Sequence, residues 1–126
     1  MIMITGGAFQ GKREFAIHRF GISGSDIADG AETEPEKLCG SRCICHYEQT
    51  VKRLLAEKKD SLEFTGNLDC EIVIINEIGS GIIPLEKSER EWREAVGRAG
   101  CILAAKADTV YRVCCGIPTV IKGEKT

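Results

Sequence analysis

Two glycines and a lysine near the start of the chain have the spacing that binds phosphate. Four residues separate Gly6 from Gly11, and Lys12 follows, which matches the phosphate-binding loop up to its last position. Glycines let successive backbone N–H groups point into one concavity, and a following helix presents the positive end of its dipole. The pattern predicts that the phosphates of a nucleotide bind to Gly6, Gly7, Ala8, Phe9, Gln10, Gly11, Lys12 and Arg13.

The residue after the lysine departs from this pattern. Arg13 stands where the loop normally has Ser or Thr, the residue that ligates Mg²⁺. Two interpretations therefore stay open for this segment. It is either a real phosphate cradle with an altered last position, or an ordinary glycine-rich turn between a strand and a helix.

A second group of polar residues follows a strongly apolar run. Ile72 to Ile75 is an uninterrupted β-branched segment, which predicts a strand buried on both faces. Ligands of open α/β sheets bind beyond the carboxyl ends of the strands. Asn76 and Glu77 are therefore expected to handle phosphate or metal, unless they only terminate the strand. Further along, Arg93 and Arg98 lie on a predicted helix, where they either reach phosphate or are simply solvated.

The seven cysteines are many for a chain of 126 residues. On a predicted helix Cys39 and Cys43 share a face and Cys45 points elsewhere, so with His46 they fit neither a paired zinc motif nor an iron–sulfur loop. We expect free, partly buried thiols and assign no metal to the protein, with a thiol or metal protein built on these four residues as the alternative. The remaining four lie in apolar surroundings and are predicted to be buried: Cys70, Cys101, Cys114 and Cys115.

These residues need a scaffold of alternating strands and helices. The patterns predict strands near 1–4, 26–28, 72–75, 109–115 and 119–122, and helices over 11–20, 40–59 and 88–106, with a short helix or turn over 60–68. Ser88 and Glu91 form a capping-box sequence at the start of the long helix, and Gly97 and Gly100 inside it suggest close packing. The order predicts a single α/β domain over residues 1–126, with a small, mostly parallel sheet and a C-terminal hairpin.

Composition limits the classes of partner. The chain is 43% hydrophobic and 29% charged with a net charge of −2, which gives no electrostatic reason to expect nucleic acid or a membrane surface. The apolar runs are shorter than a membrane span, and the start lacks a secretory signal, so we expect a cytoplasmic protein. So small a sheet leaves uncovered edges, which favours a homo-oligomer.

Three segments resemble one family. The segments are 5–12, the Ile-Asn-Glu-Ile-Gly-Ser-Gly-Ile-Ile-Pro block of 75–84 with the helix 92–98, and the closing 107–122. They are similar to the adenosylcobinamide kinase / adenosylcobinamide-phosphate guanylyltransferase family, and the similarity covers roughly residues 1–16 and 70–122. The chain is much shorter than the typical member.

The resemblance implies a phosphate-binding-loop domain of three α/β/α layers. Such a domain would phosphorylate adenosylcobinamide with ATP or GTP in the presence of Mg²⁺, and transfer GMP to the product. Lys12 would hold the triphosphate, and Glu77 would be a metal-organising or proton-accepting carboxylate. His46 is the candidate for the histidine that carries GMP, although a structural role on a helix is the alternative. A catalytically degenerate nucleotide-binding or interaction protein is the competing hypothesis, because of Arg13 and the short chain.

Overall fold

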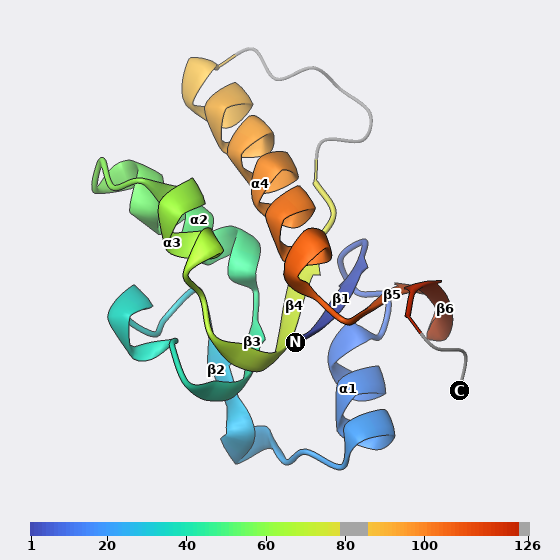
Figure 1. Ribbon diagram of the computed structural model, residues 1–126. Coiled ribbons are helices and arrows are strands. Elements are labelled where there is room, and N and C mark those ends of the chain that lie inside the picture. Colours follow the sequence, from blue (N-terminus) through green and yellow to red (C-terminus); the bar gives the residue numbers. More distant parts are fainter. Residues whose placement is uncertain (79–85, 124–126) are drawn as a thin grey trace.

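A six-stranded sheet forms the frame of the protein in the computed structural model, which describes residues 1–78 and 86–123 (Figure 1). The strand order is β2-β3-β4-β1-β5-β6. Five strands run parallel and β6 pairs with β5 antiparallel, which confirms the predicted α/β class with a C-terminal hairpin. The strands are β1 (Ile2–Gly6), β2 (Ile27–Asp29), β3 (Ser41–Cys45), β4 (Cys70–Asn76), β5 (Thr109–Cys114) and β6 (Ile117–Lys122).

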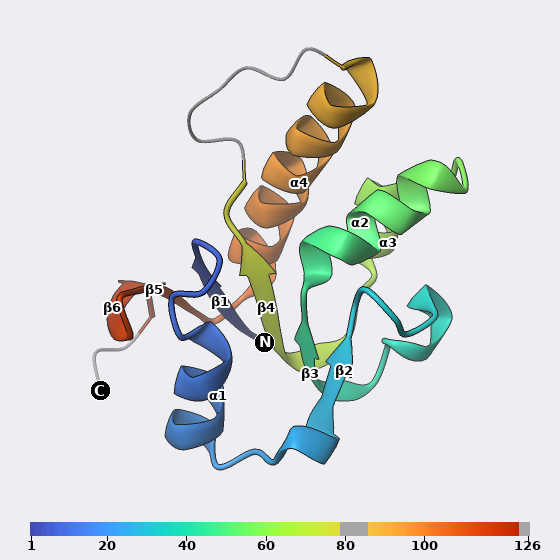
Figure 2. The ribbon, with the colours of Figure 1, turned by 180° about the vertical axis from the view of Figure 1, so that it is seen from behind.

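Helices cover both faces of this sheet (Figure 2). One face carries α1 (Lys12–Phe20), and the other carries α2 (Tyr47–Ala56), α3 (Ser61–Gly66) and α4 (Lys87–Lys106). Short 3₁₀ turns occupy Gly24–Asp26 and Pro35–Lys37. Among the described helices, none is long and apolar enough to cross a bilayer.

Neighbouring positions of each strand enter different cores. Val73 and Ile75 pack beneath α2 and α4, whereas Ile72 and Ile74 pack on the side of α1. All four are buried, as the β-branched run predicts. The alternation follows from the two-residue repeat of a strand, because successive side chains point to opposite faces.

The central strand brings the chemically interesting segments together. β1 lies between β4 and β5, and its last residue, Gly6, pairs with Asn76 at the end of β4. Because these strands are parallel, their carboxyl ends lie at one edge of the sheet, where α1 also begins. Gly21 ends α1 in the left-handed conformation, directly after the predicted helix over residues 11–20.

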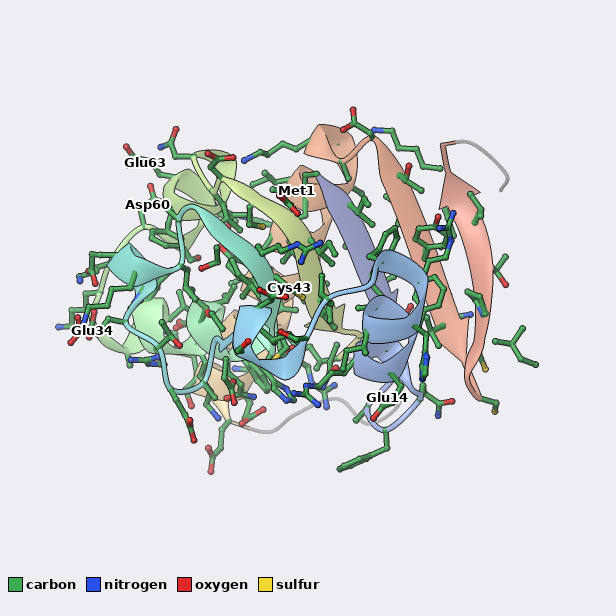
Figure 3. The ribbon with its side chains drawn as sticks, turned by 90° about the horizontal axis from the view of Figure 1, so that it is seen from below. Met1, Glu14, Glu34, Cys43, Asp60 and Glu63 are labelled. Atoms are coloured by element: carbon green, nitrogen blue, oxygen red, sulfur yellow. The ribbon has the colours of Figure 1, made fainter. Side chains whose placement is uncertain are left out.

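The predicted helix over residues 40–59 is wrong in its first part. Ser41–Cys45 is a strand, and α2 begins only at Tyr47. β3 lies between β2 and β4, so Cys43, Ile44 and Cys45 are all buried by neighbours on both faces. Apolar residues at helical spacing satisfied the helix pattern there, but burial inside the sheet decides the conformation. Cys43 lies in the interior of the molecule, whereas Glu34 and Glu63 lie at its periphery (Figure 3).

Three of the four cysteines predicted to be buried are exposed. Only Cys70 is buried, whereas Cys101, Cys114 and Cys115 are at the surface. Cys101 is on the outer side of α4, and the other two lie at the solvent-facing end of the β5–β6 hairpin. The prediction of free thiols holds, since all seven cysteines are free.

Two details of α4 also differ from expectation. The helix begins at Lys87 with Glu86 as its N-cap, so Ser88 lies inside the first turn and no side-chain cap forms. A Cβ at Gly97 would meet nothing within 4 Å, and one at Gly100 would lie 4.0 Å from the Met3 side chain. The two glycines therefore do not mark the close packing that we predicted.

Candidate nucleotide-binding site

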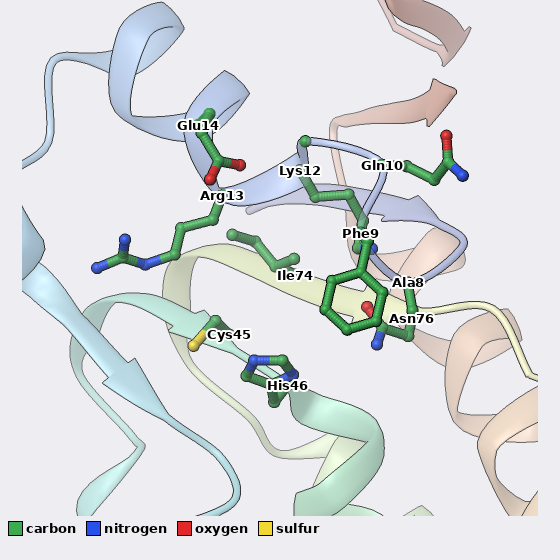
Figure 4. Close-up of a pocket in the computed structure, with 11 residues that line it drawn as sticks. Ala8, Phe9, Gln10, Lys12, Arg13, Glu14, Cys45, His46, Ile74 and Asn76 are labelled. Carbon is green, nitrogen blue, oxygen red and sulfur yellow. The ribbon is translucent and has the colours of Figure 1, made fainter. Parts of the chain in front are cut away.

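A cavity of about 240 Å³ opens at the carboxyl ends of the parallel strands. The loop after β1 lies on one side, Cys45 and His46 lie on the other, and Ile74 and Asn76 of β4 lie between them (Figure 4). It is lined by Ala8, Phe9, Gln10, Gly11, Lys12, Arg13, Glu14, Cys45, His46, Ile74 and Asn76. The structure thus brings together most of the loop residues predicted from the sequence with His46 and Asn76.

Glycine is required at both ends of the loop. Gly6 has φ +147°, and a Cβ there would lie 2.4 Å from the carbonyl oxygen of Val113 on β5. Gly11 has φ +90° and is the N-cap of α1. Phe9, at the loop tip, also has positive φ, at 58°, and its ring is fully exposed. The backbone path therefore explains the glycine spacing on which the sequence prediction rested.

Lys12 is buried with its charge turned toward the loop. Only 6% of the residue is exposed, and its Nζ donates a 2.5 Å hydrogen bond to the carbonyl oxygen of Gly7. Burial lowers the pKa of Lys12, and the negative charges of Glu48, Glu77 and Glu14 oppose that shift. A cation held in this way can exchange a neutral carbonyl for an anionic phosphate oxygen with little rearrangement.

The loop is fastened to the β5–β6 turn by a residue whose role the sequence did not reveal. The carbonyl oxygen of Gln10 accepts a hydrogen bond from the Gly116 N–H at 2.8 Å, and its Oε1 accepts one from the Cys115 N–H at 2.6 Å. Cys115 and Gly116 both have positive φ, as the tight turn of a two-residue hairpin requires. The loop is therefore supported by the edge of the sheet.

Glu77 faces a cation instead of the cavity. Its carboxylate binds Arg112 through two contacts, Nε to Oε1 at 2.8 Å and a second guanidinium nitrogen to Oε2 at 3.1 Å. The hydrogen bonds from Arg112 lower the pKa of Glu77. The Glu77 N–H also donates to the Gly6 carbonyl at 2.8 Å, so the residue stays next to the loop. It is a weak base in this arrangement.

A buried carboxylate that sequence reasoning missed lies next to His46 and Asn76, although it does not itself line the cavity. Glu48, in the first turn of α2, is 2% exposed, and its Oε1 accepts a hydrogen bond from the Asn76 N–H at 2.9 Å. Its Oε2 lies 3.4 Å from Nδ1 of His46, whose side chain is half exposed. A Glu inside an amphipathic helix pattern looks like an ordinary surface residue, so no signal in the sequence identified it.

His46 joins a strand to a helix in an unusual backbone conformation. Its φ is +53°, in the left-handed region that few non-glycine residues adopt. A side-chain oxygen of Asp29, the Cys45 thiol and a ring nitrogen of His46 lie within 4.8 Å of one another, a donor set that suits a transition metal. Burial raises the pKa of Cys45 to about 11. We assign no ion to this group, because pairing of β2 with β3 alone places Asp29 opposite Cys45.

The two arginines of α4 do not reach the cavity. Arg98 pairs with Glu94 at 2.5 Å and lines a separate hollow together with Lys59 and Asp60. Arg93 is half-buried and does not line the cavity either. Of the block at 75–84, residues 79–84 lie outside the described part of the chain.

Comparison with known proteins identifies the family. The family model described as cobinamide kinase / cobinamide phosphate guanyltransferase matches residues 37–121, which include β3, α2, α3, β4, α4 and β5 and all of β6 except its last residue. The match begins after the loop Gly6–Lys12, so that loop is supported by its own geometry.

Two curated relatives have the same name, bifunctional adenosylcobalamin biosynthesis protein CobU. The protein of Salmonella typhimurium is 41% identical over 51 residues, which is 40% of this chain and 28% of the relative. The protein of Escherichia coli is 39% identical over 77 residues, 60% of this chain and 42% of the relative. The chain thus spans less than half the length of either relative. With two thirds of its residues inside the family match, the chain belongs to the cobinamide kinase / cobinamide phosphate guanyltransferase family.

Proposed function

We propose that this protein is a nucleotide-dependent transferase of adenosylcobalamin biosynthesis that phosphorylates adenosylcobinamide with ATP or GTP. The observation that carries the proposal is Lys12, whose ammonium is buried at the mouth of a glycine loop that opens the first helix. Family membership supplies the class of substrate, since the relatives are named for adenosylcobalamin biosynthesis.

The residues at the cavity suit phosphoryl transfer by positioning and charge neutralisation. The loop N–H groups and the start of α1 receive the phosphates, and Lys12 moves from the Gly7 carbonyl to the outer phosphate oxygens. The bond between the γ-phosphorus and its bridging oxygen breaks as the cobinamide hydroxyl oxygen bonds to that phosphorus. The nucleoside diphosphate leaves with the electron pair, and the hydroxyl proton passes to water. Because Arg112 lowers the pKa of Glu77, the carboxylate contributes charge and support for the loop more than proton transfer.

The residues do not fit the magnesium site that the resemblance implies. A guanidinium at position 13 is a cation and offers no ligand atom, and both oxygens of Glu77 are bound by Arg112. We therefore assign no step to a magnesium ion held by the protein.

The Glu48–His46 pair favours a second activity, the transfer of GMP through His46. The imidazole lines the same cavity as Lys12, and a buried carboxylate faces its Nδ1. The other ring nitrogen would attack the α-phosphorus of GTP with loss of pyrophosphate, and the phosphate of the corrinoid would then take the GMP from the ring. Cobinamide kinase and guanyltransferase activities are combined in the family description.

Mass spectrometry of reaction mixtures tests both activities. The purified protein is incubated with adenosylcobinamide, Mg²⁺ and either ATP or GTP, and corrinoid products and intact protein are weighed. A phosphorylated corrinoid supports the kinase, and a GDP-corrinoid together with a protein heavier by one GMP supports the transfer through His46. Nucleotide binding without any product would favour the alternative function, a degenerate binding protein, which Arg13 makes the main competitor.

A further inference from the structure

Glu48 is a buried charge for which the proposed phosphoryl transfer has no use. Its carboxylate is removed from water, with 2% of the residue exposed. A buried carboxylate is costly unless hydrogen bonds and charges satisfy it. Its place in the first turn of α2 puts it near the positive end of the helix dipole, and the Asn76 N–H gives it one strong partner. These contacts fix one oxygen and leave the other facing His46.

Glu48 itself is held firmly. Its main-chain carbonyl accepts a 2.9 Å hydrogen bond from the indole N–H of Trp92 on α4, which fixes the start of α2 against the neighbouring helix. The Asn76 N–H comes from the end of β4, at the floor of the cavity. The carboxylate therefore has little freedom to turn, and it presents a fixed negative charge to the imidazole.

We propose that Glu48 is the positioning residue of the guanylyl transfer, holding His46 with Nδ1–H toward the carboxylate and Nε2 free to attack. The inference rests on the proposed function, because it needs His46 as the residue that carries GMP. A neutral imidazole has one donor and one acceptor nitrogen, and a carboxylate at Nδ1 selects the tautomer with an Nε2 lone pair. Nδ1 of His46 and Oε2 of Glu48 lie 3.4 Å apart, within ion-pair distance, and catalytic hydrogen bonds often shorten only when substrate binds.

The carboxylate also stabilises the intermediate. As Nε2 bonds to the α-phosphorus of GTP, the bond from that phosphorus to the bridging oxygen breaks, and pyrophosphate leaves with the electron pair. The ring keeps its Nδ1 proton, so a positive charge develops on the imidazole next to Glu48. When the phosphate oxygen of the corrinoid attacks the same phosphorus, the P–N bond breaks and the ring returns to its neutral form.

The charge of Glu48 has the opposite effect on nucleotide binding. It acts on Lys12 more strongly than the other carboxylates do, so its field extends across the phosphate cradle. Removing the charge should therefore slow guanylylation and leave the affinity for GTP equal or greater. A residue that only supports the fold would weaken both together.

Single-turnover guanylylation of the full chain, together with GTP binding, tests whether the rate falls while the affinity is kept. Glu48→Gln keeps the shape and an acceptor for Asn76, and we expect the rate constant at saturating GTP to fall on the order of a hundredfold. The dissociation constant for GTP, from calorimetry, should be unchanged or lower. The matched control is Glu57→Gln, which changes an exposed carboxylate at the other end of α2 and should alter neither value. An unchanged rate, or a parallel loss of GTP binding, would overturn the proposal.

A spectroscopic measurement tests the positioning independently of guanylyl transfer. The chain has two histidines, so ¹⁵N-labelled imidazoles give two sets of signals, and His46→Gln assigns them. We expect neutral wild-type His46 to carry its proton on Nδ1, and the Nδ1–H population to fall in Glu48→Gln while His18 is unchanged. A wild-type His46 protonated on Nε2 would overturn the positioning. Absence of guanylylated wild-type protein would instead overturn the role of His46 as nucleophile, whatever the tautomer.

Discussion

The two walls of the cavity are built on different principles. The loop Gly6–Lys12 follows a backbone path that only glycine allows at its ends, and its cation lies on a main-chain carbonyl. The wall at Cys45 and His46 uses a histidine in a conformation that usually belongs to glycine, and the Glu48 carboxylate lies 3.4 Å from its ring. In the first wall glycine residues occupy the positions that the backbone path demands, whereas in the second a histidine holds a positive φ. The loop Gly6–Lys12 can therefore be recognised from the sequence, whereas the wall at His46 cannot.

Among the tests of this comparison, we expect the largest effect from replacing Lys12. Lys12→Ala removes the buried ammonium from the cradle, and we expect affinity for ATP or GTP to fall about a hundredfold while the fold is retained. Calorimetry gives the affinity, and circular dichroism gives the fold. Lys87→Ala, which changes an exposed lysine at the start of α4, is the control. Equal affinity in Lys12→Ala would contradict the phosphate cradle.

Two glycine substitutions test how closely the backbone is packed at each wall: Gly6 begins the loop, and Gly30 packs against the backbone of His46. In Gly6→Ala the new Cβ would lie 2.4 Å from a β5 carbonyl, and in Gly30→Ala it would lie 2.3 Å from Thr50 and 2.6 Å from the His46 carbonyl oxygen. We expect each to lower the free energy of unfolding by about 3 kcal/mol, measured by chemical denaturation.

Gly97→Ala is the matched control for these substitutions. This glycine lies on the exposed side of α4 with open space around it. Alanine should raise the free energy of unfolding by about 0.5–1 kcal/mol, because it lowers the backbone entropy of the unfolded chain. Destabilisation of all three variants by similar amounts would mean that the close approaches in the two walls are not specific.

Replacing His46 separates its backbone strain from its chemistry. His46→Gly and His46→Ala should both lose guanylylation, which intact-protein mass spectrometry detects. The glycine variant should be more stable than the alanine variant by about 1 kcal/mol in thermal or chemical unfolding, because only alanine strains the positive φ. Equal stability of the two variants would show that the left-handed conformation relaxes without cost.

The smallest expected effect is the pH dependence contributed by Glu77. Arg112 lowers its pKa in the folded protein, so its contribution to stability is present above the ordinary value of 4.5 and is lost as the pH falls through the folded pKa. Arg112→Gln should therefore lessen the decline of the free energy of unfolding below pH 4.5. The effect is small because both side chains are more than a third exposed to water. Identical pH profiles for the two proteins would argue against the ion pair.

The central part of the fold was predictable because its signals are local. The β-branched run at Ile72–Ile75 indicates a doubly covered strand, and Gly21 indicates a helix end. β3 was mistaken for helix because five residues with two cysteines have no strong strand pattern of their own, and only β2 and β4 on either side make them a strand.

The candidate site divides in the same way. The glycine spacing identified the loop, and the end of a buried strand identified Asn76 as part of the cavity. Glu48, Arg112 and Gln10 were missed because their roles depend on contacts with residues 28, 35 and 105 or 106 positions away. Homo-oligomerisation remains a prediction, and the uncovered edge strand β6 with exposed Ile117 and Ile121 is where it would be sought.

The attachment of Gln10 to the β5–β6 turn has a consequence for engineering. The loop gains two of its hydrogen bonds from the turn that begins the edge strand, so the hairpin and the phosphate cradle form one mechanical unit. A tag, insertion or shortened turn placed at Cys115 and Gly116 is expected to disturb the proposed nucleotide binding although it changes no residue of the loop. The same hydrogen bonds offer a way to regulate the site, because a designed protein that binds this hairpin would act on the loop without contacting it.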